Sequence, residues 1–259
     1  MKINMTTFVT AIFNLKNSKP NDYRKSLENR LKYFEELISY NINISIICCP
    51  YYEPYIRKLI EKYHNVKLID VMNLSDTVVY KICDEYEKNN EPLYLPNVRD
   101  NDKDDREYLI LMNSKIEFVK KAIDVNIWNS KYFCWIDFSI KYMIHDENIF
   151  KININKLKYY EMPLSESTNI IIPGIETKKE IIYWHPWWRY SGTIFYGYKD
   201  DLSHFYEMNC KYFKEFIETK SLLTWEITMW AWYEWIGIIN PIWVHGRHDD
   251  SIISFVNNE

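Results

Sequence analysis

An aspartate at the end of an apolar run is the residue of this chain most suited by type and place to bind a metal ion. Residues 131–140 read KYFCWIDFSI, so Asp137 closes the run and Ser139 follows two positions later. Carboxylate and hydroxyl oxygens are ligands that Mg²⁺ and Mn²⁺ prefer. The alternative is structural, because an aspartate can also cap the turn after a strand. The segment is a candidate metal site that needs support from elsewhere in the chain.

A second group of possible metal ligands lies near the end of the chain. Residues 245–250 read HGRHDD. Histidine and aspartate side chains suit a borderline divalent metal, although their spacing here matches no zinc signature. An ordinary polar loop with surface histidines is the alternative. A metal shared between Asp137 and His248 would account for both segments.

Two cations have positions that allow two interpretations. Lys115 lies on or beside the apolar face of the amphipathic pattern that predicts a helix over 106–124. It could reach toward a phosphate or extend harmlessly to the surface. Arg99 lies in the polar stretch 89–105, which is typical of a solvated loop, and carries the same ambiguity.

Aromatic residues gather in the segment 184–193, which reads WHPWWRYSGT and includes Trp187, Trp188 and Gly192. Exposed aromatic clusters often mark binding surfaces, and flat rings suit the C–H faces of sugars. Gly192 would let a ligand approach the backbone closely. A tryptophan-rich corner of the core is the alternative.

Glu226 lies near the start of a strongly apolar helical pattern, 223–236. The helix dipole favours an acid at that position. If the side chain faces a pocket, partial burial would raise its pKa and suit it to deprotonate a hydroxyl group. The alternative is an ordinary first-turn glutamate on a surface face.

The elements that must position these residues alternate regularly in the first half of the chain. Apolar runs predict strands, and helical periodicity predicts helices. The predicted strands are 6–13, 42–49, 66–71 and the run that ends at Asp137, and the predicted helices are 22–39, 53–63, 76–88 and 106–124. This order favours a parallel sheet with right-handed crossovers, whose carboxyl edge is where such sheets bind ligands.

The second half is less regular. Its predicted strands are 169–173, 180–184, 191–198 and 237–244, and its predicted helices are 200–218 and 223–236. No linker or repeat separates the halves, so we expect one domain, 1–259, in which the second half extends the sheet.

Composition argues against several classes of partner. The net charge is −4, with acids and bases intermixed, which disfavours binding to nucleic acid or to an anionic membrane. No apolar run approaches the roughly 20 residues of a membrane helix, and the N-terminus lacks a signal-peptide pattern. The five cysteines form no C-x-x-C pair, as expected in a reducing compartment. We therefore expect a soluble, cytoplasmic protein without a transmembrane segment.

Several stretches together resemble the HtrL/YibB family, also called WlaTC/HtrL. They are TFVTAIFN from Thr7, LMNSKIEFV from Leu111, FCWIDFSI from Phe133, WE at Trp225 and HDDSI from His248. The family is similar to a branch of the GT-A nucleotide-sugar glycosyltransferases. The resemblance implies a GT-A-like, Rossmann-type α/β fold with a mixed, mostly parallel sheet flanked by helices. It also implies a nucleotide-binding half, 1–140, and an acceptor-side half, 141–259.

The resemblance, together with the interpretations of the polar stretch 89–105 and the aromatic segment 184–193, gives each candidate residue an expected role. Donor-binding roles fall to Thr10, Ala11, Asn14, Arg99, Lys115 and Arg247. Metal-binding roles fall to Asp137, Ser139 and His248. Enzymes that use nucleotide-sugars commonly have an Asp-x-Asp motif at this place, and Ser139 stands where its second aspartate would be. Glu226 would be the catalytic base, and Trp187, Trp188 and Gly192 would meet the acceptor.

The expected activity is that of a hexosyltransferase-like glycosyltransferase. A nucleoside-diphosphate sugar, expected to be a UDP-sugar, would be the donor, a glycan or other hydroxyl the acceptor, and Mn²⁺ or Mg²⁺ the cofactor. Two other functions stay open. One is a non-catalytic carbohydrate- or nucleotide-binding protein, and the other is a metal-dependent phosphoesterase built on Asp137, His248 and Asp249. The sequence does not fix whether the transfer inverts or retains configuration.

Overall fold

Seven strands form one sheet in the order β3-β2-β1-β4-β6-β5-β7. The computed structural model describes residues 6–15, 26–100, 103–162, 169–179 and 181–257. The strands are β1 (Thr6–Ile12), β2 (Asn43–Cys48), β3 (Val66–Val71), β4 (Tyr132–Ile136), β5 (Ile170–Gly174), β6 (Ile194–Tyr198) and β7 (Ile242–His245). Within this sheet β6 runs antiparallel to both of its neighbours, and the other pairings are parallel. The prediction of a mixed, mostly parallel sheet is confirmed.

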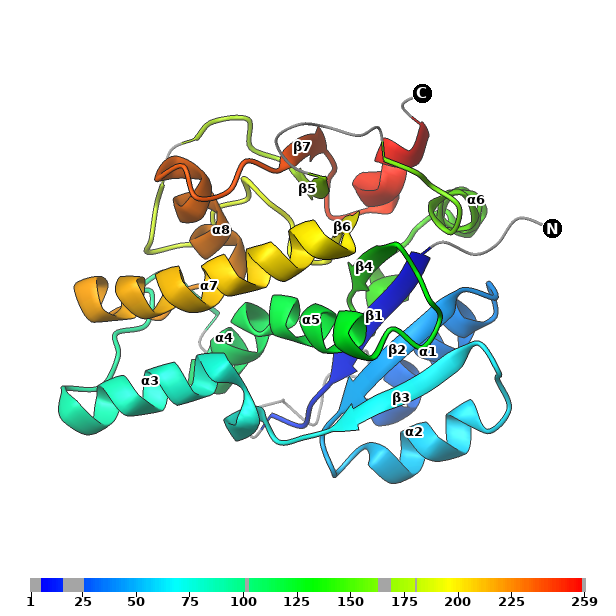
Figure 1. The fold of residues 1–259 in the computed structure, drawn as a ribbon, viewed down its shortest axis with the longest axis horizontal. Coiled ribbons are helices and arrows are strands. Elements are labelled where there is room, and N and C mark those ends of the chain that lie inside the picture. Colours follow the sequence, from blue (N-terminus) through cyan, green and yellow to red (C-terminus); the bar gives the residue numbers. More distant parts are fainter. Residues whose placement is uncertain (1–5, 16–25, 101–102, 163–168, 180, 258–259) are drawn as a thin grey trace.

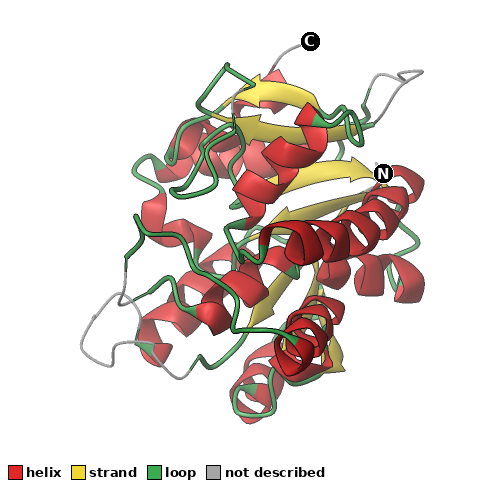
Figure 2. Ribbon diagram, turned by 90° about the vertical axis from the view of Figure 1, so that its left-hand side faces the viewer, coloured by secondary structure: helices red, strands yellow, loops and turns green. Residues whose placement is uncertain are grey.

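The helices lie against this sheet (Figures 1 and 2). They are α1 (Leu27–Ile38), α2 (Glu53–Ile60), α3 (Val78–Asn89), α4 (Arg106–Asn113), α5 (Lys115–Val125), α6 (Glu147–Leu157), α7 (Lys199–Lys220) and α8 (Glu226–Trp235). Right-handed crossovers place α1 and α2 on one face, and the return to β4 places α5 on the other. Helix α7 lies beside α5 on that second face (Figure 1).

The centre of the sheet is fully buried. Every residue of β4 is buried, because β1 and β6 flank it and helices cover it. Such strands carry near-continuous apolar runs, which explains why the first half was readable from its sequence. Strands from both halves of the chain meet at the β4–β6 pair.

The predicted single helix 106–124 is wrong, because it is broken at Ser114 into α4 and α5. The Ser114 hydroxyl donates to the carbonyl of Ile110 at 2.8 Å, and the Asn113 amide donates to the carbonyl of Thr224 at 2.8 Å. The second bond comes from a residue 111 positions away, so helical periodicity could not reveal it. As a result Lys115 is the first residue of a new helix.

Two further differences concern individual elements. The predicted strand 180–184 is wrong for residues 181–184, which form no strand; residue 180 lies outside the described residues. The carbonyls of Tyr183 and Trp184 accept bonds from Thr224 and from the backbone of Val98, so this backbone is used in loop contacts. Helix α6 was not predicted, although Asp146 caps it by accepting from two backbone N–H groups.

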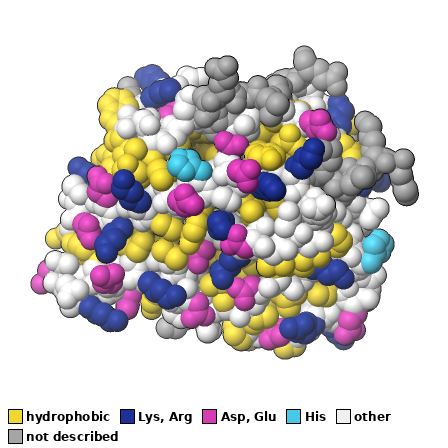
Figure 3. Space-filling model, viewed as in Figure 1, with side chains coloured by type: hydrophobic (Ala, Val, Ile, Leu, Met, Phe, Trp, Pro, Cys, Tyr) yellow, Lys and Arg dark blue, Asp and Glu magenta, His cyan; other side chains and the backbone are white. Residues whose placement is uncertain are grey.

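Helix α1 begins later than predicted. Ser26 caps it by accepting from the N–H of Asn29 at 3.3 Å, whereas positions 22–25 of the predicted helix lie outside the described residues. None of the described helices is both long and apolar enough to cross a membrane. The face seen in Figure 3 intermixes acidic and basic side chains, in keeping with the mixed charge of the sequence.

Candidate active site

One buried ammonium group gathers two of the predicted functional carboxylates. Lys115, only 2% exposed, donates to the Glu226 carboxylate at 2.9 Å and to the carbonyl oxygen of Gly192 at 2.8 Å. Its Nζ also lies 3.2 Å from Oδ1 of Asp137. These three partners match the three N–H donors of an ammonium group. We call Lys115, Asp137 and Glu226 the carboxylate centre.

The charge of Lys115 is preserved in spite of its burial. Desolvation lowers the pKa of the ammonium, but the charges of Asp137 and Glu226 and the bonds to them outweigh that effect, so the pKa is raised above its ordinary value. The lysine therefore stays protonated at neutral pH. One cation between two ionised acids would leave the centre with a surplus of negative charge.

Local structure fixes where each member of the centre lies. Lys115 opens α5 because the chain breaks at Ser114. Glu226 opens α8, where the helix dipole favours an acid. The bond from Asn113 to the carbonyl of Thr224 links the end of α4 to the segment just before α8. The same break that ends α4 thus holds Lys115 next to Glu226.

Asp137 is the member of the centre that solvent reaches. Its side chain is 36% exposed, against 6% for Glu226 and 2% for Lys115. It follows β4 directly, and its N–H donates to the carbonyl of Thr193 at 3.0 Å. The Trp135 indole donates to Asp137 Oδ1 at 2.8 Å. One carboxylate oxygen is therefore oriented by the protein at the carboxyl edge of the sheet.

Gly192 is part of this centre and not only a neighbour of the aromatic segment. A Cβ built there would lie 1.8 Å from Oε1 of Glu226 and 3.1 Å from Nζ of Lys115. No side chain fits in that space unless Glu226 moves. The glycine is therefore required by the close approach of Glu226 to the backbone.

Tyr108 adds a hydroxyl group that the sequence analysis did not single out. Burial raises its pKa well above the ordinary value, and the charges of Glu226 and Asp137 raise it further. The phenol stays protonated close to two carboxylates. In the sequence, the position of Tyr108 on the apolar face of the predicted helix 106–124 indicates packing. Only its residue type, a phenol that can donate a hydrogen bond, could have suggested a functional role.

His248 and Trp188 meet beside the centre. Their ring centroids are 5.7 Å apart, although His248 as a whole is exposed. Desolvation of the imidazole lowers its pKa, while the charge of Asp137 acts in the opposite direction, which places His248 within electrostatic reach of the centre. Trp188 is 38% exposed, so part of its surface is open to a ligand.

Trp187 and Arg247, the sequence neighbours of Trp188 and His248, do not contact the carboxylate centre through their side chains in the described part of the chain. The backbone N–H of Trp187 donates to the Thr228 hydroxyl of α8 at 3.4 Å, and its buried indole N–H has no hydrogen-bond partner within the described part of the chain. Arg247 is exposed, and its backbone N–H donates to the Ser251 hydroxyl at 2.9 Å. No contact among the described residues brings the Arg247 guanidinium to the centre.

The predicted nucleotide-side residues lie along the end of β1. Thr10 is fully buried, and its hydroxyl has no hydrogen-bond partner among the described residues. The β1–β4 register pairs Val9 with Trp135, so Ala11 lies level with Asp137. Asn14 is exposed just beyond the strand. Arg99 donates to the Pro96 carbonyl at 2.9 Å, and no contact in the described ranges joins it to the centre.

The residues at this edge offer a divalent cation an incomplete set of ligands. Nowhere in the described residues do three His, Cys, Asp or Glu side chains come together to hold a metal. Mg²⁺, however, is often held by one or two carboxylates together with substrate phosphates and water. Asp137, 36% exposed at the sheet edge, is a carboxylate suited to a cation of that kind, and His248 lies within its electrostatic reach.

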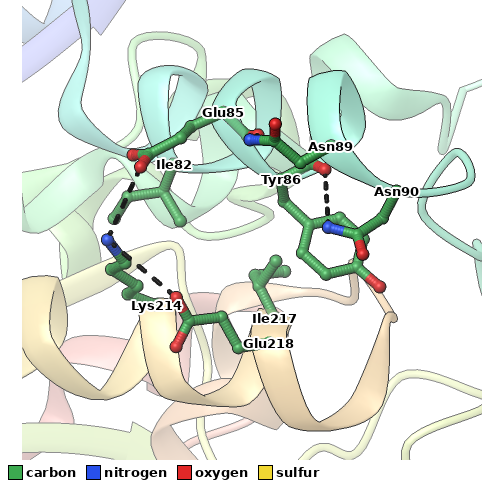
Figure 4. A pocket seen from close by; sticks show the side chains of 8 residues that line it. All are labelled: Ile82, Glu85, Tyr86, Asn89, Asn90, Lys214, Ile217 and Glu218. Atoms are coloured by element: carbon green, nitrogen blue, oxygen red, sulfur yellow. Dashed lines mark hydrogen bonds and ion pairs between the residues drawn. The ribbon is translucent and has the colours of Figure 1, made fainter.

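The cavity shown in Figure 4 lies elsewhere. It has a volume of about 250 Å³ and opens between α3 and α7. Lys214 lies 3.9 Å from both Glu85 and Glu218 on its wall. None of its lining residues belongs to the carboxylate centre.

Comparison with known proteins gives one family match. The model of a family described as "Bacterial protein of unknown function (HtrL_YibB)" matches residues 4–220. No curated protein matches the chain.

The chain is also distantly similar to solved structures. One is 4-diphosphocytidyl-2C-methyl-D-erythritol synthase of Anaerococcus prevotii DSM 20548, with 14% identity, TM-score 0.43, and 98% of this chain and 95% of that chain covered. Mouse xyloside xylosyltransferase 1, in its apo form, has 8% identity, TM-score 0.42, and coverage of 89% and 81%. A glycosyltransferase involved in glycosylating the major capsid of PBCV-1 has 13% identity, TM-score 0.40, and coverage of 93% and 80%.

The mixed sheet, with β6 antiparallel between β4 and β5 and helices on its faces, defines an α/β protein with a mostly parallel sheet. The chain belongs to the HtrL/YibB family, whose model covers it from residue 4 to residue 220.

Proposed function

We propose that the protein is a glycosyltransferase that takes a sugar from a nucleoside-diphosphate sugar. The observation that carries this proposal is the carboxylate centre. Asp137 and Glu226 share the Lys115 ammonium at the carboxyl edge of β4, where α/β sheets bind ligands. An open acid beside a buried acid gives the edge two carboxylates in different environments, as acid–base chemistry requires.

In the transfer, the bond between the anomeric carbon and the diphosphate breaks, and its electron pair leaves with the diphosphate. The acceptor hydroxyl oxygen forms the new bond to that carbon and loses its proton. In an inverting reaction, Glu226 would receive this proton as general base. Lys115 would hold Glu226 in position. Gly192 would leave the space that Glu226 needs.

The open side of the centre suits the donor. Asp137 would face the donor diphosphate, with Thr10, Ala11 and Asn14 along the end of β1 lining the nucleotide site. A Mg²⁺ or Mn²⁺ ion bound by Asp137 and His248 with the diphosphate would neutralise charge on the leaving group. A UDP-sugar is the donor we propose to test first.

The acceptor would lie on the side of Trp188. Its ring is partly exposed and contacts His248 beside the centre. A flat indole of this kind presents an apolar face to a sugar ring. A glycan or another molecule with a hydroxyl group is therefore the proposed acceptor.

The test is a panel of nucleotide-sugars with Mn²⁺, with Mg²⁺ or with EDTA. The protein's melting temperature and the release of nucleoside diphosphate are measured in parallel. We expect one nucleotide-sugar to raise the melting temperature, more so with the metal, and to be hydrolysed slowly without acceptor. Binding of free sugar with no effect of the nucleotide would instead indicate a carbohydrate-binding protein. Phosphate release from simple phosphoesters would indicate a phosphoesterase.

A further inference from the structure

Arg30 lies on α1 with its guanidinium group between two aromatic rings. The guanidinium carbon is 5.7 Å from the centre of the Tyr52 ring and 5.8 Å from that of Phe138. Its Nη1 donates one long hydrogen bond, 3.4 Å, to the Tyr52 hydroxyl. A guanidinium has five N–H donors, so most of its capacity is left for another acceptor.

Arg30 differs from other half-buried or buried arginines in the described part of the chain. Arg106 and Arg189 donate to glutamates at 2.9 Å and 2.8 Å. No carboxylate among the described residues pairs with Arg30. Desolvation lowers its pKa, opposed by Tyr52 and Cys49. Removing a charge from water without a counter-charge is costly, so the fold retains this one at an expense to stability.

The position of Arg30 is at the carboxyl edge of the middle strands. Phe138 directly follows Asp137 at the end of β4. Tyr52 lies just after β2, and the neighbouring Cys49 thiol accepts from the N–H of Asn14 beyond β1. The guanidinium is therefore held over the ends of β1, β2 and β4.

We propose that Arg30 binds the diphosphate of the donor. The planar fork of a guanidinium matches two phosphate oxygens, and the two rings hold its plane in one orientation. An anion here would supply the negative charge that the described residues do not provide. The proposal rests on the proposed glycosyltransferase function, since it names the part of the donor that this edge holds. When the sugar departs, Arg30 would stabilise the charge gained by the leaving diphosphate.

The test uses inorganic pyrophosphate and UDP as probes, measured by calorimetry with and without Mg²⁺. We expect Arg30→Met to weaken binding of both probes by about tenfold to a hundredfold, because charge-assisted hydrogen bonds are lost. Arg30→Lys should lie between this variant and the wild type. Arg57→Met is the matched control, because Arg57 on α2 is 59% exposed and already paired with Glu53.

A second measurement separates loss of binding from loss of fold. Because Arg30 has no carboxylate partner among the described residues, we expect Arg30→Met to keep or raise the melting temperature. Wild-type protein that binds pyrophosphate in neither buffer would overturn the inference, and so would an Arg30→Met variant that binds as the wild type does. If pyrophosphate binds through Arg30 but no nucleotide-sugar is bound or hydrolysed, the anion site stands and the glycosyltransferase proposal fails.

Discussion

Two buried ion clusters in this protein have opposite compositions. In the carboxylate centre one cation, Lys115, serves two acids. In the second cluster one acid, Glu234, serves two cations: it accepts from Arg189 at 2.8 and 2.9 Å and from Lys179 at 2.9 Å. The first cluster has a surplus of negative charge and the second a surplus of positive charge.

We call the second cluster closed because its acid is buried, although the Lys179 side chain is 58% exposed; in the first cluster an acid itself reaches solvent. Arg189 also donates to the carbonyls of Glu176 and Thr177, and the Glu234 side chain is 4% exposed. Burial alone would raise the pKa of Glu234, but the bonds from Arg189 and Lys179 lower it to about 2. Asp137, in contrast, keeps 36% of its side chain in contact with solvent. We infer that the Arg189 cluster holds the 174–190 segment against α8, whereas the carboxylate centre is available for chemistry.

The largest expected effect is on turnover, at Asp137, and it distinguishes a catalytic centre from a structural ion cluster. Asp137→Asn should reduce nucleotide-sugar turnover by about a hundredfold to a thousandfold, the range found when one group that stabilises a transition state is removed. Its melting temperature should change little, because the side chain is partly exposed. Asp70→Asn is the matched control, since Asp70 is 35% exposed and pairs with Lys121 at 2.9 Å. Equal turnover in the two variants would contradict the assignment.

The second prediction concerns the closed cluster. Glu234→Gln should lower the free energy of unfolding by roughly 3 kcal/mol, because breaking a buried pair leaves a charge uncompensated. Denaturant unfolding measures this. Glu147→Gln is the control, and it should change the free energy of unfolding far less, because Glu147 is 66% exposed in its pair with Lys141 and solvent screens that pair. Variant protein that remains folded should keep its turnover.

The same cluster should govern acid stability. The pKa of Glu234 is depressed in the folded protein, so its contribution is complete above the ordinary value of 4.5 and is lost as pH falls toward about 2. Wild-type stability should decline across that interval. Glu234→Gln should show less of this decline, and an identical pH profile in the variant would refute the role.

A smaller effect is expected at Gly192. Alanine there would place a methyl group 1.8 Å from Oε1 of Glu226, so the carboxylate must move. A displacement of this size should reduce turnover by up to about a hundredfold. Gly237→Ala serves as control: its φ of +76° strains an alanine, but nothing lies within 4 Å of the added carbon. That variant should lose stability and keep its turnover.

The smallest effect is expected at the edge of the centre. Trp188→Ala should raise the KM for the acceptor by roughly fivefold, the loss of a stacking contact worth about 1 kcal/mol, and leave donor hydrolysis unchanged. Trp235→Ala is the comparison, because Trp235 is 63% exposed at the end of α8. An effect on donor hydrolysis in Trp188→Ala would place this ring on the donor side instead.

The sequence was sufficient for the first half of the sheet and for the approximate place of Asp137. Buried strands such as β4 are apolar throughout, and β1 adds only threonines to its apolar residues, so local composition reveals them. Lys115 remained ambiguous, because a lysine on an apolar face is explained only by its partners. Its partner Glu226 is 111 residues away. No local pattern encodes such a pairing.

Arg30 shows a different limit of sequence-based inference. Arg30 is unusual because no carboxylate among the described residues pairs with it. This is known only once the structure shows that its neighbours are Tyr52 and Phe138. The break at Ser114 was missed for a related reason. The bond that accompanies it runs from the Asn113 amide to the carbonyl of Thr224, in the segment just before α8.

The position of β6 between β4 and β5 has a consequence for how the protein is made. Synthesis delivers the chain from its N-terminus, at roughly 5–20 residues per second. Strands β1 to β4 can pair with one another before β6 exists, but β4 then remains an open edge. Gly192 and β6 close that edge, and Glu226 is added only later in the chain. The carboxylate centre is therefore completed late in synthesis, and a nascent chain that lacks α8 would have Lys115 and Asp137 without the proposed base.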